Sequence, residues 1–198
     1  MESLNTEILV VMIAVGAYFF AAIPFGLVLS KFAGLGDIRN IGSGNIGATN
    51  VLRTGNKKIA ALTLFFDVLK GMMVVLVSAH FIPGHEYALG FLAIFAHIFP
   101  IYLKFKGGKG VATALGVYFA WSPFLGLSVL VTWLITAKIF RISSLSALVA
   151  ALCAPFFTYF LGVNAEAIPF TVLIAAVLLY THRENIKRIF NNQEPFIS

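Results

Sequence analysis

The segment KFKGGKGVAT, residues 104–113, has the residue types of an anion-binding site. Gly107, Gly108 and Gly110 surround Lys109 directly before an apolar run. The first N–H groups and the dipole of a helix attract an anion, and glycines let a phosphate come close. The loop is not a Walker A motif, because Gly110 stands where Ser or Thr should follow the lysine. An ordinary basic loop would account for the lysines but not for the glycines, so the sequence favours an anion site.

A second polar segment, GDIRNIGSGNIGATNVLRTGNKK at residues 36–58, is rich in glycine, hydroxyl and amide side chains. Its side chains could coordinate a polar ligand, and its only acid is Asp37. Gly42, Gly44 and Gly47 match the G-x-G-x-x-G dinucleotide pattern, but that pattern needs a preceding strand within a βαβ unit. An apolar run precedes it here, so we reject a nucleotide-binding interpretation. A flexible polar loop without a ligand remains an alternative.

Two further groups of residues are ambiguous from sequence alone. Residues 141–144 and the segment 182–185 bring serines, a histidine and an asparagine next to apolar runs, where helix capping and lipid headgroup contacts are the simpler explanation. Asp67 and Lys70 share a helix face within an apolar run, and His97 lies within another. Ionisable groups at membrane depth are often functional but can also lock a helix bundle, and both interpretations stay open.

The composition requires a lipid environment for these segments. Hydrophobic residues make up 60% of the 198 residues and charged residues 11%, whereas a soluble domain has roughly 25% charged residues. The single cysteine, Cys153, excludes a disulfide framework within the chain. The first apolar run is too long for a cleavable signal peptide, so we expect it to be retained as a helix.

Apolar runs of spanning length predict the helices. They are Ile8–Ser30, Ile59–Ala79, Tyr87–Leu103, Val111–Ala137, Leu145–Leu161 and Ala167–Tyr180. The fourth run is interrupted at Trp121-Ser122-Pro123, and proline favours the first turn of a new helix. Dividing the run there places every lysine and arginine outside the apolar runs on one side of the membrane, as the positive-inside rule requires.

We therefore predict an all-α integral membrane protein with seven transmembrane helices in a single domain, residues 1–198. The N-terminus would lie outside, the C-terminus in the cytoplasm, and the fourth and fifth helices would be short.

The motifs GSGNIGATNVLRTG, DVLKG, HIFPIYLKFKGGKGVAT and HRENIKR occur in this order over nearly the whole chain. With them the sequence resembles the bacterial acyl-phosphate:glycerol-3-phosphate acyltransferases, the PlsY family. The resemblance implies transfer of a fatty acyl group from acyl phosphate to the sn-1 hydroxyl of glycerol 3-phosphate. The products would be lysophosphatidic acid and phosphate, at the first step of phospholipid synthesis in the cell inner membrane, with the active site on the cytoplasmic face.

The resemblance also implies the site residues, and Glu184 by the same resemblance would be structural. The catalytic candidates are Ser43, Asn45, Arg53, Lys109, His182 and Asn185. The substrate-binding candidates are Thr49, Asn50, Gly107, Gly108, Gly110, Ser143 and Ser144. The base that deprotonates the attacking hydroxyl would be His182 or a phosphate oxygen of the substrate. We expect direct attack without an acyl-enzyme.

Residues that the chain lacks exclude other classes. No histidine is followed five positions later by aspartate, as glycerolipid acyltransferases of the other type require, and two aspartates cannot build the metal site of a CDP-alcohol phosphotransferase. We expect no metal, no cofactor and no nucleic-acid partner, and a chain that can act as a monomer in contact with membrane lipid. A transporter of small phosphorylated solutes is the alternative function.

Overall fold

The computed structural model describes residues 2–197, and no strand forms within them. The α-helices are α1 (Glu2–Ala21), α2 (Phe25–Phe32), α3 (Ala48–Leu52), α4 (Lys57–Phe81), α5 (Glu86–Ile98), α6 (Val111–Trp121), α7 (Pro123–Phe140), α8 (Ser143–Phe160), α9 (Ala167–Thr181) and α10 (Arg183–Phe190). Short 3₁₀ turns occupy Ile38–Asn40 and Ile101–Leu103. The all-α fold is as expected.

Four stretches of helix are long and apolar enough to cross a membrane: Lys57–Phe81, Glu86–Leu103, Pro123–Phe140 and Ser143–Phe160. Thr6–Ala21 and Phe25–Phe32 are bent by 43° to each other and count as a fifth span if taken together. The two remaining apolar helices, α6 and α9, are shorter. Length and composition thus support four or five spans in the described residues, rather than the seven expected.

The interruption predicted at Ser122-Pro123 is confirmed. α6 ends at Trp121, the Ser122 hydroxyl accepts a hydrogen bond from the Leu125 N–H, and Pro123 takes the first position of α7. α6 is short as expected, with 11 residues, but the expectation of a short α7 is wrong because that helix has 18 residues. Lys138 does not end α7, since a lysine side chain can extend from the last turn of a helix toward water.

Glycine lets the backbones of α4 and α6 meet directly. A Cβ atom added at Gly116 would lie 1.9 Å from the Val68 carbonyl oxygen, and one added at Gly71 would lie 2.3 Å from the Thr113 carbonyl oxygen. Small residues at such crossings are the usual means of close helix packing in membranes, where lipid removes the hydrophobic drive between helices. The crossing places the start of α6 beside α4.

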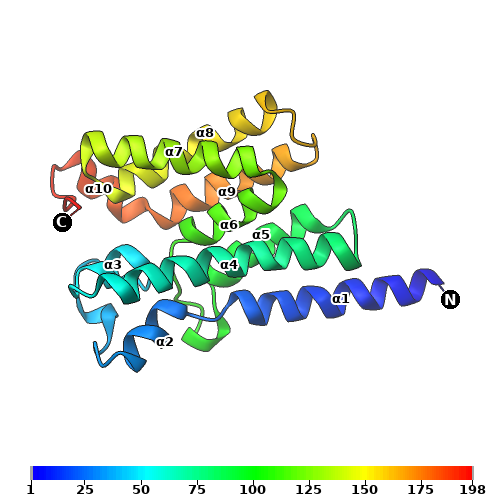
Figure 1. Cartoon of the computed structure of the whole chain (residues 1–198), viewed down its shortest axis with the longest axis horizontal. Coiled ribbons are helices and arrows are strands. Elements are labelled where there is room, and N and C mark those ends of the chain that lie inside the picture. The colour runs from blue at the N-terminus through cyan, green and yellow to red at the C-terminus, as the bar shows by residue number, and fades with distance from the viewer. Residues whose placement is uncertain (1, 198) are drawn as a thin grey trace.

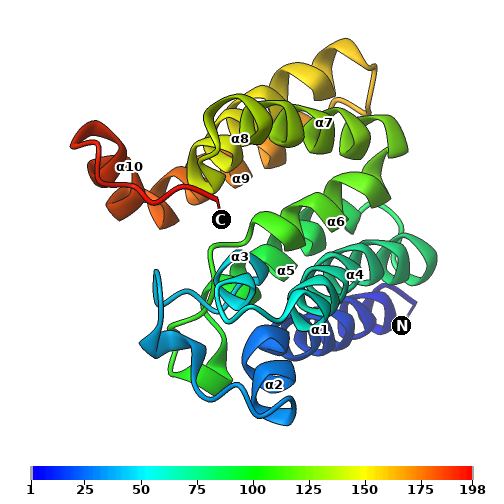
Figure 2. The same cartoon turned by 60° about the vertical axis from the view of Figure 1, so that its left-hand side comes forward.

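The helices form two groups that Figure 2 separates clearly. α1 to α6 make the first group, α7 to α10 the second, and the chain passes from one to the other at Ser122. In Figure 1, α3, α10 and the C-terminus lie at one end of the molecule, and the N-terminus lies at the opposite end. The polar segments singled out in the sequence therefore gather at one end of the helices.

Candidate active site

A cavity of about 500 Å³ lies between the two helix groups. Its polar part is lined by Ser43, Asn45, Thr49, Asn50, Arg53, Lys109, Gly110, Ser143, Ser144, His182, Asn185 and Glu194. The ionisable residues Lys57, Asp67 and His97 also line the cavity. Its apolar part is lined by residues of α4, α6, α7 and α8, among them Leu64, Leu115, Tyr118, Leu130 and Trp133. All the expected site residues except Gly107 and Gly108 are thus brought to one cavity from segments far apart in sequence.

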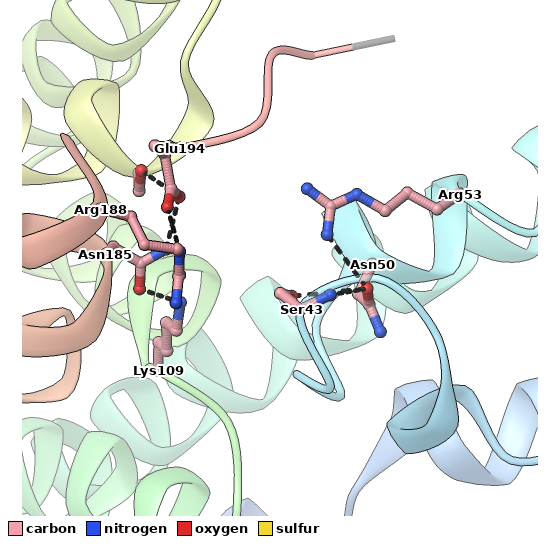
Figure 3. A network of polar contacts seen from close by, with 8 residues as sticks. Ser43, Asn50, Arg53, Lys109, Asn185, Arg188 and Glu194 are labelled. Atoms are coloured by element: carbon pink, nitrogen blue, oxygen red, sulfur yellow. Dashed lines mark hydrogen bonds and ion pairs between the residues drawn. The ribbon is translucent and has the colours of Figure 1, made fainter. Parts of the chain in front are cut away.

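Asn50 organises the first wall of the cavity. Its amide nitrogen donates to the Ile38 carbonyl oxygen at 2.7 Å, and its amide oxygen accepts from the Ser43 backbone N–H at 3.1 Å. The same oxygen accepts from the Arg53 guanidinium at 3.4 Å (Figure 3). Because the Asn50 side chain is buried and hydrogen-bonded at both its nitrogen and its oxygen, it shapes the loop that carries Ser43 and Arg53.

The opposite wall is a chain of polar contacts that ends on a carboxylate. Lys109 Nζ donates to the amide oxygen of Asn185, whose amide nitrogen donates to Glu194 at 2.6 Å. The Ser144 hydroxyl and the Arg188 guanidinium also donate to Glu194, each at 2.7 Å. Figure 3 shows this wall facing Ser43, Asn50 and Arg53 across the site.

Glu194 is the site residue that sequence reasoning missed. Its side chain is 6% exposed, although it lies in the tail that follows α10. Glu184, to which we assigned a structural role, is exposed and pairs with Lys187 at the surface. The available signal was a single carboxylate in a tail whose other side chains are uncharged, and it carried too little information to indicate a buried position.

Burial and hydrogen bonds shift the pKa values of Lys109 and Glu194 in the second wall. Burial lowers the pKa of Lys109 to about 8, although the nearby Glu194 charge opposes this shift. Burial raises the pKa of Glu194, but hydrogen bonds from Ser144, Asn185 and Arg188 outweigh that effect and lower it. At neutral pH the wall therefore presents a charged ammonium whose proton is held less firmly than that of an ordinary lysine.

His182 is a neutral imidazole at physiological pH. Burial lowers its pKa to about 4, and the positive charge of Lys109 acts in the same direction. Its Nδ1 lies 2.8 Å from the Leu178 carbonyl oxygen, which can only accept, so Nδ1 carries the proton and Nε2 the lone pair. The ring can accept a hydrogen bond at Nε2, but it is a weak base.

Thr49 and Ser143 connect the two walls, because their hydroxyl oxygens lie 3.3 Å apart. Asn45 is turned toward its own loop, where its amide oxygen accepts from the Ile46 N–H at 3.0 Å. Gly110 lines the cavity at the start of α6, in a left-handed conformation with φ of 89°. That conformation strains any residue with a Cβ atom, so a glycine is needed at this turn.

Gly107 and Gly108 lie behind the cavity wall. Their backbone N–H groups donate to the carbonyl oxygens of Ile98, at 3.0 Å, and His97, at 3.1 Å. These two N–H groups satisfy the end of α5, so they are already engaged. Among the described residues, no group of three His, Cys, Asp or Glu side chains is placed to hold a metal ion.

Known proteins give this arrangement a context. Residues 11–192 match the family model described as glycerol-3-phosphate acyltransferase. The chain is 49% identical over 179 residues to a glycerol-3-phosphate acyltransferase of Brucella anthropi, covering 89% of this chain and 88% of the relative. Its identity to the enzyme of that description from Agrobacterium fabrum is 50% over 188 residues, covering 94% of this chain and 91% of the relative.

Two solved structures are similar along nearly the whole chain. Both are crystal structures of PlsY (YgiH), described as an integral membrane glycerol 3-phosphate acyltransferase. The glycerol 3-phosphate form has a TM-score of 0.89 at 37% identity and covers 95% of each chain. The lysophosphatidic acid form has a TM-score of 0.85 at 35% identity and covers 94% of each chain.

The contacts of Glu194 predict that its replacement destabilises the protein much more than the replacement of Glu184, another glutamate of the C-terminal segment. Glu194→Ala removes the shared acceptor of Ser144, Asn185 and Arg188, and leaving such donors unsatisfied costs roughly 1–3 kcal/mol. Glu184→Ala is the matched control, since an exposed ion pair contributes about 0–1 kcal/mol. Thermal unfolding of the detergent-purified variants should show a clear loss of stability for the first alone. Equal losses would contradict the assignment.

Proposed function

The chain belongs to the glycerol-3-phosphate acyltransferase family, and on this premise we propose that its acyl donor is an acyl phosphate. The acyl group is transferred to the sn-1 hydroxyl of glycerol 3-phosphate, which gives lysophosphatidic acid and inorganic phosphate. The observation that carries this proposal is that one cavity is lined both by polar residues, with Arg53 and Lys109 among them, and by apolar residues of four helices. One substrate comes from water and the other from lipid, and the cavity has a suitable lining for each.

Three cations, Arg53, Lys57 and Lys109, line the cavity, and Arg53 and Lys109 stand on opposite sides of its polar part (Figure 3). Arg53 stands on the first wall and Lys109 on the second, and both line the cavity. Arginine binds a phosphate through a rigid fork of donors, whereas lysine supplies a point charge. We assign Arg53 and Lys109 to hold the phosphates of the two substrates, with the acyl carbonyl between them. Gly107 and Gly108 then support the site through Lys109, and Gly110 through the start of α6.

The apolar part suits a fatty acyl chain. Leu64 of α4, Leu115 of α6 and Leu130 of α7 line it, and Tyr118 and Trp133 add large aromatic surfaces. Burying a methylene group of the chain against such a lining contributes about 0.8 kcal/mol. The acyl chain would thereby hold the reacting carbonyl beside the polar walls, where position and charge can act on it.

The reaction needs little activation of the nucleophile, because phosphate is a good leaving group. The sn-1 oxygen attacks the acyl carbonyl carbon, and the bond from that carbon to the phosphate oxygen breaks. Ser43, Asn45, Ser143 and Asn185 orient the acyl phosphate and stabilise the developing oxyanion by hydrogen bonds. His182 is too weak a base, with its pKa near 4, to take the hydroxyl proton efficiently. We assign the proton to a phosphate oxygen of the substrate, and His182 to accepting a hydrogen bond.

The finer topology is part of the same proposal. We infer that α6 and α9 also cross the bilayer, that the N-terminus lies outside, and that the cavity's polar part faces the cytoplasm across the inner membrane. The basic residues outside the helices gather with the polar segments, and anionic lipid and the positive-inside rule favour that end in the cytoplasm.

The activity is tested with purified protein in detergent. A long-chain acyl phosphate and glycerol 3-phosphate should give 1-acyl lysophosphatidic acid and phosphate in equal amounts, and the CoA thioester of the same chain should give none. Lys109→Ala should lower kcat/KM about 100-fold, as loss of a charge that stabilises the transition state does. Lys106→Ala, an exposed lysine of the same loop, should stay close to wild type.

Two outcomes of that assay would contradict the proposal. Equal use of the CoA thioester would remove the acyl phosphate as the specific donor. A radiolabelled acyl group found covalently on the protein, after incubation with the donor and no acceptor, would replace direct attack by an acyl-enzyme mechanism.

The buried position of Lys109 predicts a distinctive pH dependence. Its lowered pKa, about 8, means that the ammonium loses its proton as the pH rises through that value. The kcat/KM for glycerol 3-phosphate, which reports the free enzyme, should therefore fall above about pH 8. Lys109→Arg keeps its charge at all these pH values, so its activity, though lower, should lack this fall. The same alkaline fall in Lys109→Arg would exclude Lys109 as the titrating group.

The topology is tested by single cysteines in a chain with Cys153 replaced by serine. A membrane-impermeant maleimide should label, from outside the cell, cysteines that replace the exposed residues Gly84 and Asn164. Cysteines at Lys138 and Asn192 should react only in inverted membrane vesicles, because basic segments stay in the cytoplasm. Labelling of the Lys138 position from outside would show that α6 and α7 do not form two separate spans.

A further inference from the structure

Three ionisable side chains lie together inside the protein, and the proposed reaction uses none of them, although two of them, Asp67 and His97, line the cavity. Lys70 and Asp67 of α4 and His97 of α5 are 0%, 2% and 5% exposed. Lys70 Nζ lies 2.8 Å from Asp67 Oδ1 and 2.8 Å from His97 Nδ1, and it donates to the Ile23 carbonyl oxygen at 3.0 Å. The cluster joins α4 and α5 to the bend between α1 and α2.

The contacts of Lys70 fix the state of the histidine. An ammonium carries three hydrogens and cannot accept, so His97 Nδ1 must accept from Lys70. The imidazole is therefore neutral, with its proton on Nε2. Asp67 balances the charge of Lys70, and breaking such a buried pair by removing one partner is strongly destabilising. Lys70 is thus held in place by Asp67, and its contact with Nδ1 fixes the His97 ring.

The glycine pair of the 104–110 loop is seated on this ring. A Cβ atom added at Gly108 would lie 2.1 Å from His97 Nε2, and one added at Gly107 would lie 2.2 Å from the His97 carbonyl oxygen. The N–H of Gly108 donates to that same carbonyl oxygen at 3.1 Å. Since neither glycine lines the cavity, the space that each one leaves is filled by His97 and the end of α5.

The next residue along the chain is Lys109. Its carbonyl oxygen accepts from the Thr181 hydroxyl at 3.1 Å, and its ammonium reaches Asn185. Lys109 is therefore held between the seat on His97 and the end of α9. A shift of the loop by the width of a methyl group would move the ammonium relative to both substrates, and misplacement of about 1 Å can cost 100-fold in rate.

We propose that Asp67, Lys70 and His97 are positioning residues that seat the Gly107–Gly108 backbone on the imidazole ring and thereby fix the place of the Lys109 ammonium. This inference rests on the proposed function. It gives the glycine pair a different role from the one that the sequence indicated, which was close approach of a phosphate.

A double-mutant cycle between residues 108 and 97 separates the two roles. Gly108→Ala should lower kcat/KM by about 10-fold in the wild-type background, because the added methyl meets a fixed ring. In a His97→Ala background the ring is gone, so Gly108→Ala should cost less than about threefold. Gly16→Ala, at an exposed glycine of α1 with no atom near the added Cβ, is the matched control and should leave activity unchanged.

Two further readouts distinguish positioning from general support. In Gly108→Ala we expect Lys109 to be displaced and less buried, so the alkaline fall of kcat/KM should move to higher pH. In the double variant this fall should move back to the pH at which it occurs in the wild type. His97→Asn supplies an amide oxygen that can accept from Lys70, and it should keep more activity and stability than His97→Leu. The conservative variant keeps the test decisive if His97→Ala does not purify in folded form.

The inference is overturned if Gly108→Ala raises the KM for glycerol 3-phosphate equally with and without the His97 ring. That result would mean that the glycine makes room for the substrate phosphate. Melting temperatures of the same four proteins give a second cycle that needs no substrate, and additive shifts there would also overturn the inference. If instead no lysophosphatidic acid forms with wild-type protein, the proposed function fails while the melting cycle still tests the contact.

Discussion

The fully buried ammonium of Lys70 constrains how the elements around it can be arranged. In a protein covered largely by lipid, a charge away from water must find its partners within the chain, and Lys70 finds one on each of three elements. Asp67 comes from the same helix, His97 from α5, and the Ile23 carbonyl oxygen from the bend where α1 cannot continue before Pro24. The bend, the α4–α5 pair and the seat of the glycine loop are therefore parts of one arrangement.

The candidate active site has two walls, and different kinds of contact hold each of them in place. The first wall is a glycine-rich loop folded around the buried amide of Asn50, so its shape is set by its own contacts. The second wall is assembled from the start of α6, the start of α8, α10 and the tail after α10. Glu194 gathers three donors of that wall, and a carboxylate there offsets the basic surroundings and keeps Lys109 beside Asn185. In the proposed reaction, the two walls would hold the polar groups of both substrates at the end of the helices.

The sequence predicted most of the polar lining of the cavity, including Ser43, Arg53, Lys109, His182 and Asn185, because the resemblance to a known family supplied the residues by motif. It also located the start of α7, since Ser122 and Pro123 act on their immediate neighbours. α7 is longer than predicted, because the apolar run ends before Lys138 whereas the helix continues to Phe140. Length and composition support four or five spans rather than seven, since α6 and α9 are too short to qualify alone.

What the sequence alone determined are the properties that arise from neighbouring residues and from sums over the chain: an all-α membrane protein, a break at Ser122-Pro123, and polar segments in a definite order. What only the tertiary structure decided depends on contacts between distant residues. Lys109 contacts Asn185, which lies 76 positions further along the sequence, and Ser144 contacts Glu194, which lies 50 positions further along. The glycine pair faces His97 rather than the cavity for the same reason. Local sequence shows that a glycine leaves space, but only the packed helices show which group fills it.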